Sequence, residues 1–311
     1  MTSAPASIER RPVTAGAALY TLGLAVLFGA NPTAIKFGLR YLEPLQIGSA
    51  RFLLAGCALL AWALVSRRRV LPARAELAPL ALLAALFVAT IATTNLGQDR
   101  TSVAHTVVIL TTFPIWTAIL SHLFVSGDRI GRAQVVGIVV SYAGVLVTFG
   151  PGLASGGSQL QGDLLIFVSS FLLGGSQVLI SILSQRIELA KIVLTQAFTA
   201  GVLLLLVSVP LEGTDYGFAW PLVWSLLYQG VLIGGFAFIA NAWLLKTYPP
   251  SRISVIYSSQ PLFGILSSWV VLGEPLHSEV IAGVLLVSLG ILIVQEAWTV
   301  LLRGRERAAA G

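Results

Sequence analysis

The stretch from Ser251 to Val294 reads SRISVIYSSQPLFGILSSWVVLGEPLHSEVIAGVLLVSLGILIV, and the fold follows from it. Two apolar runs flank a short polar hinge, and Pro261 lies near the middle of the first run. Much earlier in the chain, the stretch from Thr101 to Val147 has the same plan, with Pro114 in the place of Pro261. Because a repeated unit determines the architecture of a chain, this repeat carries more weight than any single motif.

The repeat extends over most of the chain at a nearly constant shift. The two prolines match at a shift of 147 residues, and the other matches lie at a shift of 146. The matching pairs are Asp128 and Glu274, Gly137 and Gly283, Gly144 and Gly290, Gly29 and Gly175, Arg40 and Arg186, Phe52 and Phe198, and Asn95 and Asn241. We therefore predict two copies, residues 1–149 and 163–311, joined by the Gly- and Ser-rich linker 150–162.

The composition excludes a soluble protein. Of the 311 residues, 56% are hydrophobic and only 10% are charged, whereas a soluble domain carries about 25% charged residues. A net charge of +6 would suggest a nucleic-acid partner in a soluble protein, but here the basic residues lie in short loops between apolar runs. We therefore expect an integral membrane protein that binds the lipid bilayer and no nucleic acid. Strand-like alternation is absent, which favours helices.

The apolar runs have the length of membrane-spanning helices, which need ~20 residues each to cross the hydrocarbon core. About ten such runs occur: Ala17–Phe37, Pro44–Val65, Leu77–Leu96, Val103–Val125, Ala133–Phe149, Asp163–Leu183, Ile192–Leu211, Leu222–Leu245, Ser254–Leu272 and Val280–Leu301. We predict an all-α integral membrane fold of ten transmembrane helices, with five helices in each copy.

The basic residues of the loops predict the orientation, since Lys and Arg accumulate on the cytoplasmic side. One side receives Arg10, Arg11, Arg67, Arg68, Arg69, Arg74, Arg129, Arg132, Arg186, Lys191, Lys246, Arg252, Arg303, Arg305 and Arg307. The other side has only Lys36, Arg40 and Arg100. Both termini are therefore expected in the cytoplasm. Because each copy has an odd number of spans, the copies enter the membrane from opposite sides and form inverted repeats, an architecture typical of secondary transporters.

Several segments resemble the drug/metabolite transporter superfamily in its EamA branch. They are FGANPTAIKFGL at residues 28–39, the pair Arg51 and Phe52, the proline-bearing fourth and ninth spans, and LGEPL at 272–276 before a Gly-rich last span. The counterpart of LGEPL in the first copy departs from the pattern and reads VSGDRI. The resemblance implies a ten-helix carrier of small metabolites, and among such carriers the YddG-like aromatic amino acid exporters are the preferred comparison.

Amide side chains at paired positions are the first candidates for a substrate-binding cavity, because polar groups inside a bilayer need a partner or a cavity. Asn31 corresponds to Gln177, and Asn95 corresponds to Asn241. Amides both donate and accept hydrogen bonds and therefore suit a zwitterion, although they could equally hold helices together. The further cavity candidates are Phe28, Thr94, Thr111, Phe236, Tyr257 and Gln260.

Three residues are candidates for hinges or gates. Pro114 and Pro261 each remove a backbone donor near mid-span, which either creates a site for bending or substrate or leaves a fixed kink. Arg51 lies about two turns into the second span and could bind a carboxylate, pair with an acid as a gate, or snorkel to the outer interface. The acids considered as gate partners are Glu43, Asp99 and Glu274. Each of the hinge acids Asp128 and Glu274 is most simply a partner for a helix N-terminus.

The last span of each copy carries small residues on one face. They are Gly137, Ser141 and Gly144 in the fifth span, and Ala282, Gly283 and Gly290 in the tenth. Small residues let helices approach closely, so we expect these spans to form a packing scaffold. Dimerisation through this face is the alternative; we expect a monomer, with a homodimer as the second possibility.

Signals of an enzyme are missing from the sequence. It has no GxxxxGK[ST] loop, no HExxH and no paired acids at metal spacing, and His105, His122 and His277 lie on different segments. We therefore expect no cofactor. Our hypothesis is a secondary active exporter of amino acids, aromatic ones included, working by alternating access across the inner membrane. The alternatives are an efflux carrier for drugs, nucleosides, sugars or quaternary cations, and then a membrane-embedded enzyme, a channel or a scaffold.

Overall fold

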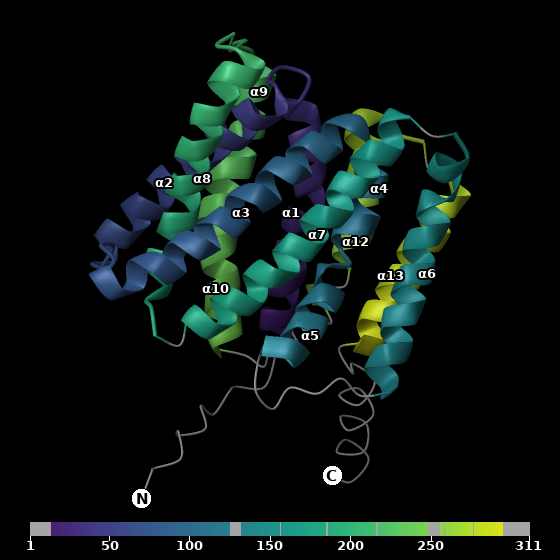
Figure 1. Ribbon diagram of the computed structural model, residues 1–311, viewed down its shortest axis with the longest axis horizontal. Coiled ribbons are helices and arrows are strands. Elements are labelled where there is room, and N and C mark those ends of the chain that lie inside the picture. Colours follow the sequence, from purple (N-terminus) through teal and green to yellow (C-terminus); the bar gives the residue numbers. More distant parts are fainter. Residues whose placement is uncertain are drawn as a thin grey trace, which may run out of the picture.

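The computed structural model describes residues 14–124, 132–155, 157–184, 186–215, 217–247, 256–257, 259–275 and 277–294. Helices dominate these residues (Figure 1). The first copy contributes α1 (Ala15–Gly38), α2 (Pro44–Val65), α3 (Arg74–Arg100), α4 (Val103–Leu110), α5 (Phe113–Phe124) and α6 (Arg132–Ser155). The second contributes α7 (Ser158–Leu183), α8 (Leu189–Glu212), α9 (Trp220–Leu226), η1 (Leu227–Ala237), α10 (Phe238–Thr247), α12 (Gln260–Leu272) and α13 (Ser278–Val294).

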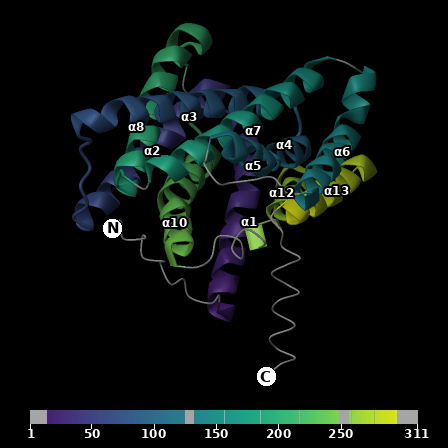
Figure 2. The same ribbon diagram turned by 60° about the horizontal axis from the view of Figure 1, so that its bottom comes forward.

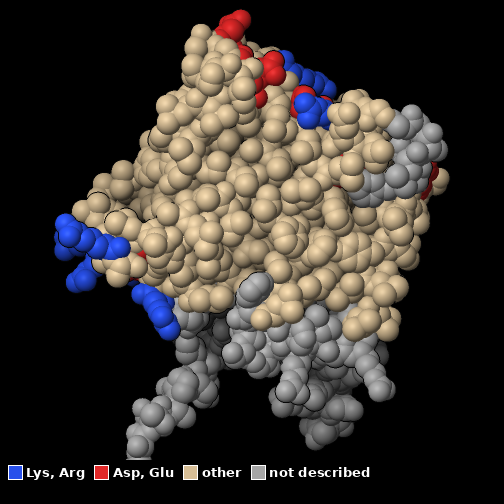
Figure 3. All heavy atoms as spheres, in the orientation of Figure 1, with Lys and Arg blue, Asp and Glu red and all other residues tan. Residues whose placement is uncertain are grey.

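The helices confirm the all-α membrane fold. In the described part of the chain, six helices are long and apolar enough to cross a bilayer, and four shorter apolar helices complete the pattern of ten spans. The shorter ones are Val103–Thr117, Val135–Thr148, Gln260–Leu272 and Ser278–Ile293. Figure 3 shows charged side chains at the top of the view and at its lower left, with a broad uncharged area between them, as a bilayer requires.

The contacts between helices follow a two-fold exchange of the copies. The last spans of the two copies, α6 and α13, pack together at one edge (Figure 1), and so do the second spans, α2 and α8. The most extensive of the other contacts between copies occur in exchanged pairs: α3 with α7 and η1 with α1, α1 with α12 and α7 with α5, α2 with η1 and α8 with α3. This pattern fits a two-fold relation between the copies, and five spans in each copy make them inverted repeats. Figure 2 shows α3 and α7 running alongside each other across the molecule.

The expected scaffold of small residues is confirmed. A Cβ atom placed on Gly144 would come within 2.8 Å of the carbonyl oxygen of Gly283, and one placed on Gly290 within 2.5 Å of the carbonyl oxygen of Gly137. The hydroxyl of Ser141 donates to the carbonyl of Val287 at 3.3 Å. The face is therefore filled within one chain and is not free for the alternative dimer contact.

The fourth span is interrupted, although the sequence suggested one run from Val103 to Val125. The chain makes a turn at Thr111 and Thr112, between α4 and α5. Because Pro114 has no N–H, it cannot donate to the carbonyl of Leu110, and the helix breaks there. The hydroxyl of Thr111 donates to the carbonyl of Val107 at 2.5 Å, and that of Thr112 donates to the carbonyl of Ile109 at 2.7 Å. These bonds supply donors to carbonyl groups at the end of α4.

The eighth span is one run from α9 through η1 to α10, but its middle is a π-helix of 11 residues. The wider turn brings a row of glycines against α2. A Cβ on Gly230 would lie 2.8 Å from the carbonyl oxygen of Arg51, and one on Gly234 would lie 2.6 Å from the Cβ of Ala55. π-helical segments of this kind are frequent at functional sites.

The ninth span differs from the sequence expectation in where its proline lies. Pro261 occupies the first turn of α12, and not the middle of a helix. At that position its missing N–H costs nothing, because the first N–H groups of a helix have no partner within it. Residues 251–255 and Ser258 lie outside the described residues, as does Asp128 in the corresponding hinge of the first copy. Between the copies, α6 runs to Ser155 and α7 begins at Ser158, so much of the stretch 150–162 is helical.

Candidate functional site

A cluster of aromatic rings joins the first helix to the second copy. The ring of Phe28 on α1 lies 5.9 Å from that of Phe238 on α10 and 6.1 Å from that of Tyr257, both edge to face. Figure 2 shows α1 between α10 and α12. The cluster therefore lies at the seam between the inverted copies.

Three polar atoms beside this cluster are buried without a hydrogen-bond partner: Asn31 Oδ1, Asn241 Oδ1 and the hydroxyl of Tyr257. Asn31 follows Phe28 by one turn of α1, and Asn241 follows Phe238 by one turn of α10. Because the first and eighth spans run antiparallel, the two amides lie on opposite sides of the ring contact. Buried polar groups are nearly always bonded in proteins, so this unpaired set indicates a place for a ligand.

Asn95, the other candidate amide of the first copy, is hydrogen-bonded to α2. Asn95 is fully buried, donates to the carbonyl of Pro44 at 2.8 Å and accepts from Arg51 at 3.3 Å. The hydroxyl of its neighbour Thr94 lies 2.7 Å from the carbonyl of Thr90 and 2.5 Å from the hydroxyl of Ser169. Both side chains therefore have hydrogen-bond partners within the protein.

The remaining cavity candidates are dispersed. Gln177 and Phe236 are exposed on the outside of the helices that carry them, and Phe236 is 49% exposed. Thr111 ends α4 at the interruption of the fourth span. Gln260 begins α12 and lies against α1, where its carbonyl oxygen would be 2.6 Å from a Cβ on Gly29. The structure thus places Phe28 and Tyr257 in contact, with Gln260 close to them. Gln177 and Phe236 lie on exposed surface, and Thr111 lies at the break between α4 and α5.

Arg51 does not snorkel, because only 5% of it is exposed. Its guanidinium donates to Gln229 Oε1 at 3.4 Å and to Asn95 Oδ1 at 3.3 Å. Among the described residues it forms no ion pair with an acid, so the suggested pairing with Glu43, Asp99 or Glu274 does not occur here. Gln229 is an amide inside an apolar span, and the rule that selected Asn95 could have selected it.

A second buried polar group missed in the sequence lies where α3, α4 and α7 meet. His105 Nδ1 is 2.9 Å from Asp163 Oδ2, and the hydroxyl of Thr101 donates to Asp163 Oδ1 at 2.5 Å. Asp163 is fully buried and His105 nearly so. The sequence held a signal for this pair, because His105 lies near the start of the fourth apolar run and Asp163 begins the sixth. Within the described residues, no three His, Cys, Asp or Glu side chains are placed to hold a metal ion.

Carboxylates of the second copy cap helices of the first. Glu274 accepts from the backbone N–H groups of Val103 at 3.0 Å and Ala104 at 3.3 Å. At the other edge, Glu212 accepts from the backbone N–H of Leu45 at 2.9 Å and that of Gln46 at 3.0 Å. The expectation that Glu274 serves a helix N-terminus is confirmed, and the helix is α4 of the opposite copy.

We predict that Glu274→Gln destabilises the protein. The amide keeps one acceptor oxygen but loses the negative charge that favours the N-terminal end of a helix dipole, which costs about 0.5–2 kcal/mol. Thermal unfolding in detergent should show a lower melting temperature for this variant. Asp215→Asn changes an exposed acid and should leave the melting temperature unchanged; equal values for both variants would contradict the capping role.

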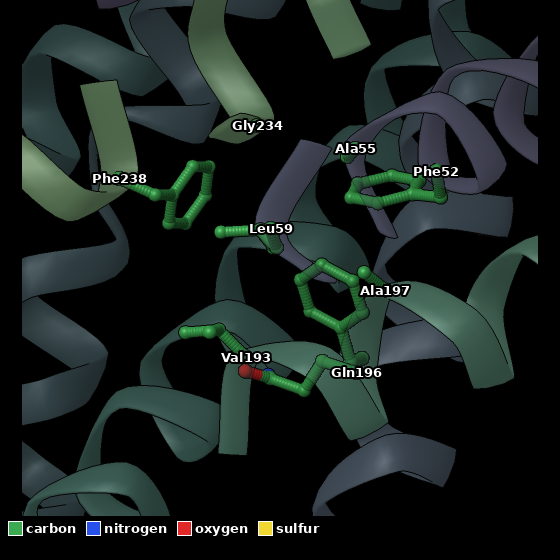
Figure 4. A pocket seen from close by; sticks show the side chains of 9 residues that line it. Phe52, Ala55, Leu59, Val193, Gln196, Ala197, Gly234 and Phe238 are labelled. Carbon is green, nitrogen blue, oxygen red and sulfur yellow. The ribbon is translucent and has the colours of Figure 1, made fainter. Parts of the chain in front are cut away.

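A shallow, half-open pocket lies on the other side of Phe238, with enclosed space for little more than one or two water molecules. It lies between α2, α3, α8 and the eighth span, and Figure 4 shows Phe238 and Phe52 entering it from different helices. Its lining consists of Phe52, Ala55, Leu59, Phe87, Val193, Gln196, Ala197, Gly234 and Phe238. Gln196 is the only amide in an otherwise apolar lining, and Phe238 belongs both to this pocket and to the aromatic cluster at the seam.

Comparisons with known proteins agree with the repeat. The model of the EamA-like transporter family matches residues 15–150 and 160–295, once for each copy. The uncharacterized transporter YoaV of Bacillus subtilis strain 168 is 23% identical over 88% of this chain and 94% of its own length. A probable amino-acid metabolite efflux pump of Salmonella typhimurium is 26% identical over 87% of this chain and 91% of its own length.

A solved crystal structure has the same fold. It superposes with a TM-score of 0.69 at 16% sequence identity and covers 94% of this chain and 100% of its own. At that identity the likeness concerns the arrangement of helices alone. That arrangement is therefore shared well beyond the reach of sequence similarity.

Proposed function

Since the chain belongs to the EamA-like transporter family, and is a multi-pass membrane transporter, we propose that its substrates are amino acids, aromatic ones included, and that it exports them. One observation carries the proposal: the unpaired atoms of Asn31, Asn241 and Tyr257 border the rings of Phe28 and Phe238. Amides and a hydroxyl can bind the charged groups of a zwitterion, and the rings offer a surface for an aromatic side chain. The name of the Salmonella relative supports the same class.

The proposed transport cycle is alternating access. The seam between inverted copies is where such carriers place their substrate, often at interrupted helices. The break between α4 and α5 and the π-helix η1 provide two interruptions in this chain. With both termini in the cytoplasm, as the basic loops favour, Asn31 would lie in the outer half of the membrane and Asn241 in the inner half. A substrate moving outward would then pass from the second amide to the first.

Counterflow in proteoliposomes tests the proposal. Vesicles containing the purified protein and unlabelled phenylalanine should accumulate labelled phenylalanine from outside, and the flux should saturate. Asn31→Ala or Asn241→Ala should each reduce the initial rate about tenfold, because each removes one hydrogen bond to a charged group. Gln161→Ala is the matched control, since Gln161 is an exposed amide at the start of α7, and its rate should equal that of the unmodified protein.

The other outcomes separate the alternatives. Saturable counterflow of a nucleoside, a sugar or a quaternary cation, without any of an amino acid, would replace the substrate class and keep the carrier. Amino-acid counterflow that is unchanged in both asparagine variants would remove the proposed site. Currents of single open channels in planar bilayers would exclude a carrier altogether.

A further inference from the structure

The guanidinium of Arg51 is the most unusual charge in the described interior. It is buried in the apolar part of α2, and its Nε atom has no hydrogen-bond partner. Its two bonds, at 3.3 and 3.4 Å, go to neutral amides and are long. A charge in this position is expensive, and in membrane proteins it is nearly always paired or used.

The amides around Arg51 are held so that their oxygen atoms face it. Asn95 donates its Nδ2 to the carbonyl of Pro44, and Gln229 donates its Nε2 to the carbonyl of Ala34 at 3.1 Å. Gln229 also donates to the hydroxyl of Ser225 at 2.9 Å. These fixed bonds leave only the oxygens for the guanidinium. The amides thus orient the cation but supply no negative charge to neutralise it.

A single phenyl ring separates this cation from the pocket. The guanidinium carbon of Arg51 lies 4.9 Å from the centre of the Phe52 ring, and Phe52 lines the pocket together with Ala55. A rotation of Phe52 about its side-chain bonds would open the guanidinium to a ligand in the pocket. Phe238 borders both this pocket and the aromatic cluster at the seam.

The charge of Arg51 has no counterpart in the second copy. At the shift of 146, Arg51 corresponds to Ala197, which is a small apolar residue in the lining of the pocket. The site beside the pocket is therefore asymmetric, with a cation from α2 and apolar side chains from α8.

We propose that Arg51 binds the carboxylate of a ligand at a second position, separate from the amides at the seam. Rotation of the Phe52 ring would expose the guanidinium and enlarge the pocket, which would then receive the apolar or aromatic body of the ligand. The ligand class is an organic acid or amino acid with an apolar side chain. The inference rests on the proposed function for the statement that this ligand is transported, but the binding itself does not depend on it. A carboxylate can accept two parallel hydrogen bonds from a guanidinium and neutralises its charge. The amides around Arg51 supply no such negative charge.

Thermal shift in detergent with four probes tests the binding. They share a phenyl ring and differ in charge: phenylalanine, 3-phenylpropionate, phenylalaninamide and phenethylamine. The two carboxylates should raise the melting temperature by mass action. The amide and the amine should bind at least about tenfold more weakly, because they cannot pair with the guanidinium.

Two variants examine the parts of the site. Arg51→Met should abolish the preference for carboxylates. Its melting temperature without ligand should equal or exceed that of the unmodified protein, because it removes a buried unpaired charge. Ala197→Leu should fill the pocket and weaken all four probes. Ala61→Leu, at an exposed position of α2, is the matched control and should change none of them.

The outcomes distinguish this inference from the proposed function. Binding of 3-phenylpropionate that depends on Arg51, without counterflow of phenylalanine, would keep the inference and overturn the proposed function. Counterflow of phenylalanine, together with equal binding of phenylalanine and phenylalaninamide, would keep the proposed function and overturn the inference. A lower melting temperature of Arg51→Met, with unchanged preference among the probes, would give Arg51 a structural role and overturn the inference.

Discussion

Gly290→Leu is expected to yield no stably folded protein. The α6–α13 contact leaves no room at this position, since even a Cβ atom would lie 2.5 Å from the carbonyl oxygen of Gly137 and from the backbone nitrogen of Ser141. Backbone atoms cannot rotate away as a side chain can, so the two helices would have to separate. Overpacking in a close-packed interior usually costs about 1–3 kcal/mol, and the loss of a whole helix contact costs more.

Size-exclusion chromatography in a mild detergent measures this effect. The variant should elute as aggregate, or be lost during extraction, while Gly290→Ala should fold with a reduced melting temperature. Gly23→Leu is the matched control, because a Cβ on Gly23 has nothing within 4 Å. A monodisperse Gly290→Leu protein that melts near the temperature of the unmodified chain would contradict the close approach of α6 and α13.

Asp163→Leu is expected to destabilise the protein strongly, and adding His105→Leu should restore much of the loss. Removing the acid leaves the buried imidazole and the hydroxyl of Thr101 without their partner. Breaking a buried pair from one side costs about 3–5 kcal/mol, whereas replacing both members by apolar side chains is often nearly neutral. The double variant should therefore be more stable than Asp163→Leu alone.

Melting temperatures of the two single variants and the double variant give the coupling between the residues. Glu188→Leu is the control, because its pair with Arg68 spans 4.0 Å and both side chains are substantially exposed. An exposed pair contributes about 0–1 kcal/mol, so this variant should melt close to the unmodified protein. Additive losses for Asp163 and His105 would show that the two side chains do not act as a pair.

The architecture could be predicted from the sequence because a membrane imposes strong and simple rules. Each span must be apolar and long enough, and a repeat with an odd number of spans must be inverted. The second span, Pro44–Val65, was predicted with the same bounds that α2 has, since a proline starts it and arginines follow it. The family resemblance carried by LGEPL and the other quoted segments is likewise confirmed.

The interruptions within spans could not be predicted because they depend on neighbouring helices. The π-helix η1 lies where Gly230 and Gly234 pack closely on α2, and glycine alone in a span does not predict such a turn. Pro261 looked like a mid-helix proline until the start of α12 placed it in the first turn.

The candidate site could be predicted only in part because an amide looks the same in every apolar span. The sequence makes Asn31 and Asn95 equally good candidates for the cavity. In the structure, the side-chain oxygen of Asn31 has no hydrogen-bond partner, whereas both the oxygen and the nitrogen of Asn95 have one. Snorkelling of Arg51 could be rejected only from the structure, which shows that its side chain is buried. Gln177 was selected through its repeat partner Asn31, but its side chain is exposed. The roles of these residues in transport stay predictions until the flux and binding experiments test them.

The capping acids have a consequence for the history of this chain. Glu212 and Glu274 both belong to the second copy, and both satisfy helix N-termini of the first. At the shift of 146, Ser66 stands in the first copy where the second has Glu212. Two molecules of residues 1–149 could therefore not rebuild the Glu212 cap, even though a duplicated gene implies an ancestor that paired with itself. The halves have become unlike partners, since the second alone supplies the Glu212 carboxylate that caps α2 of the first.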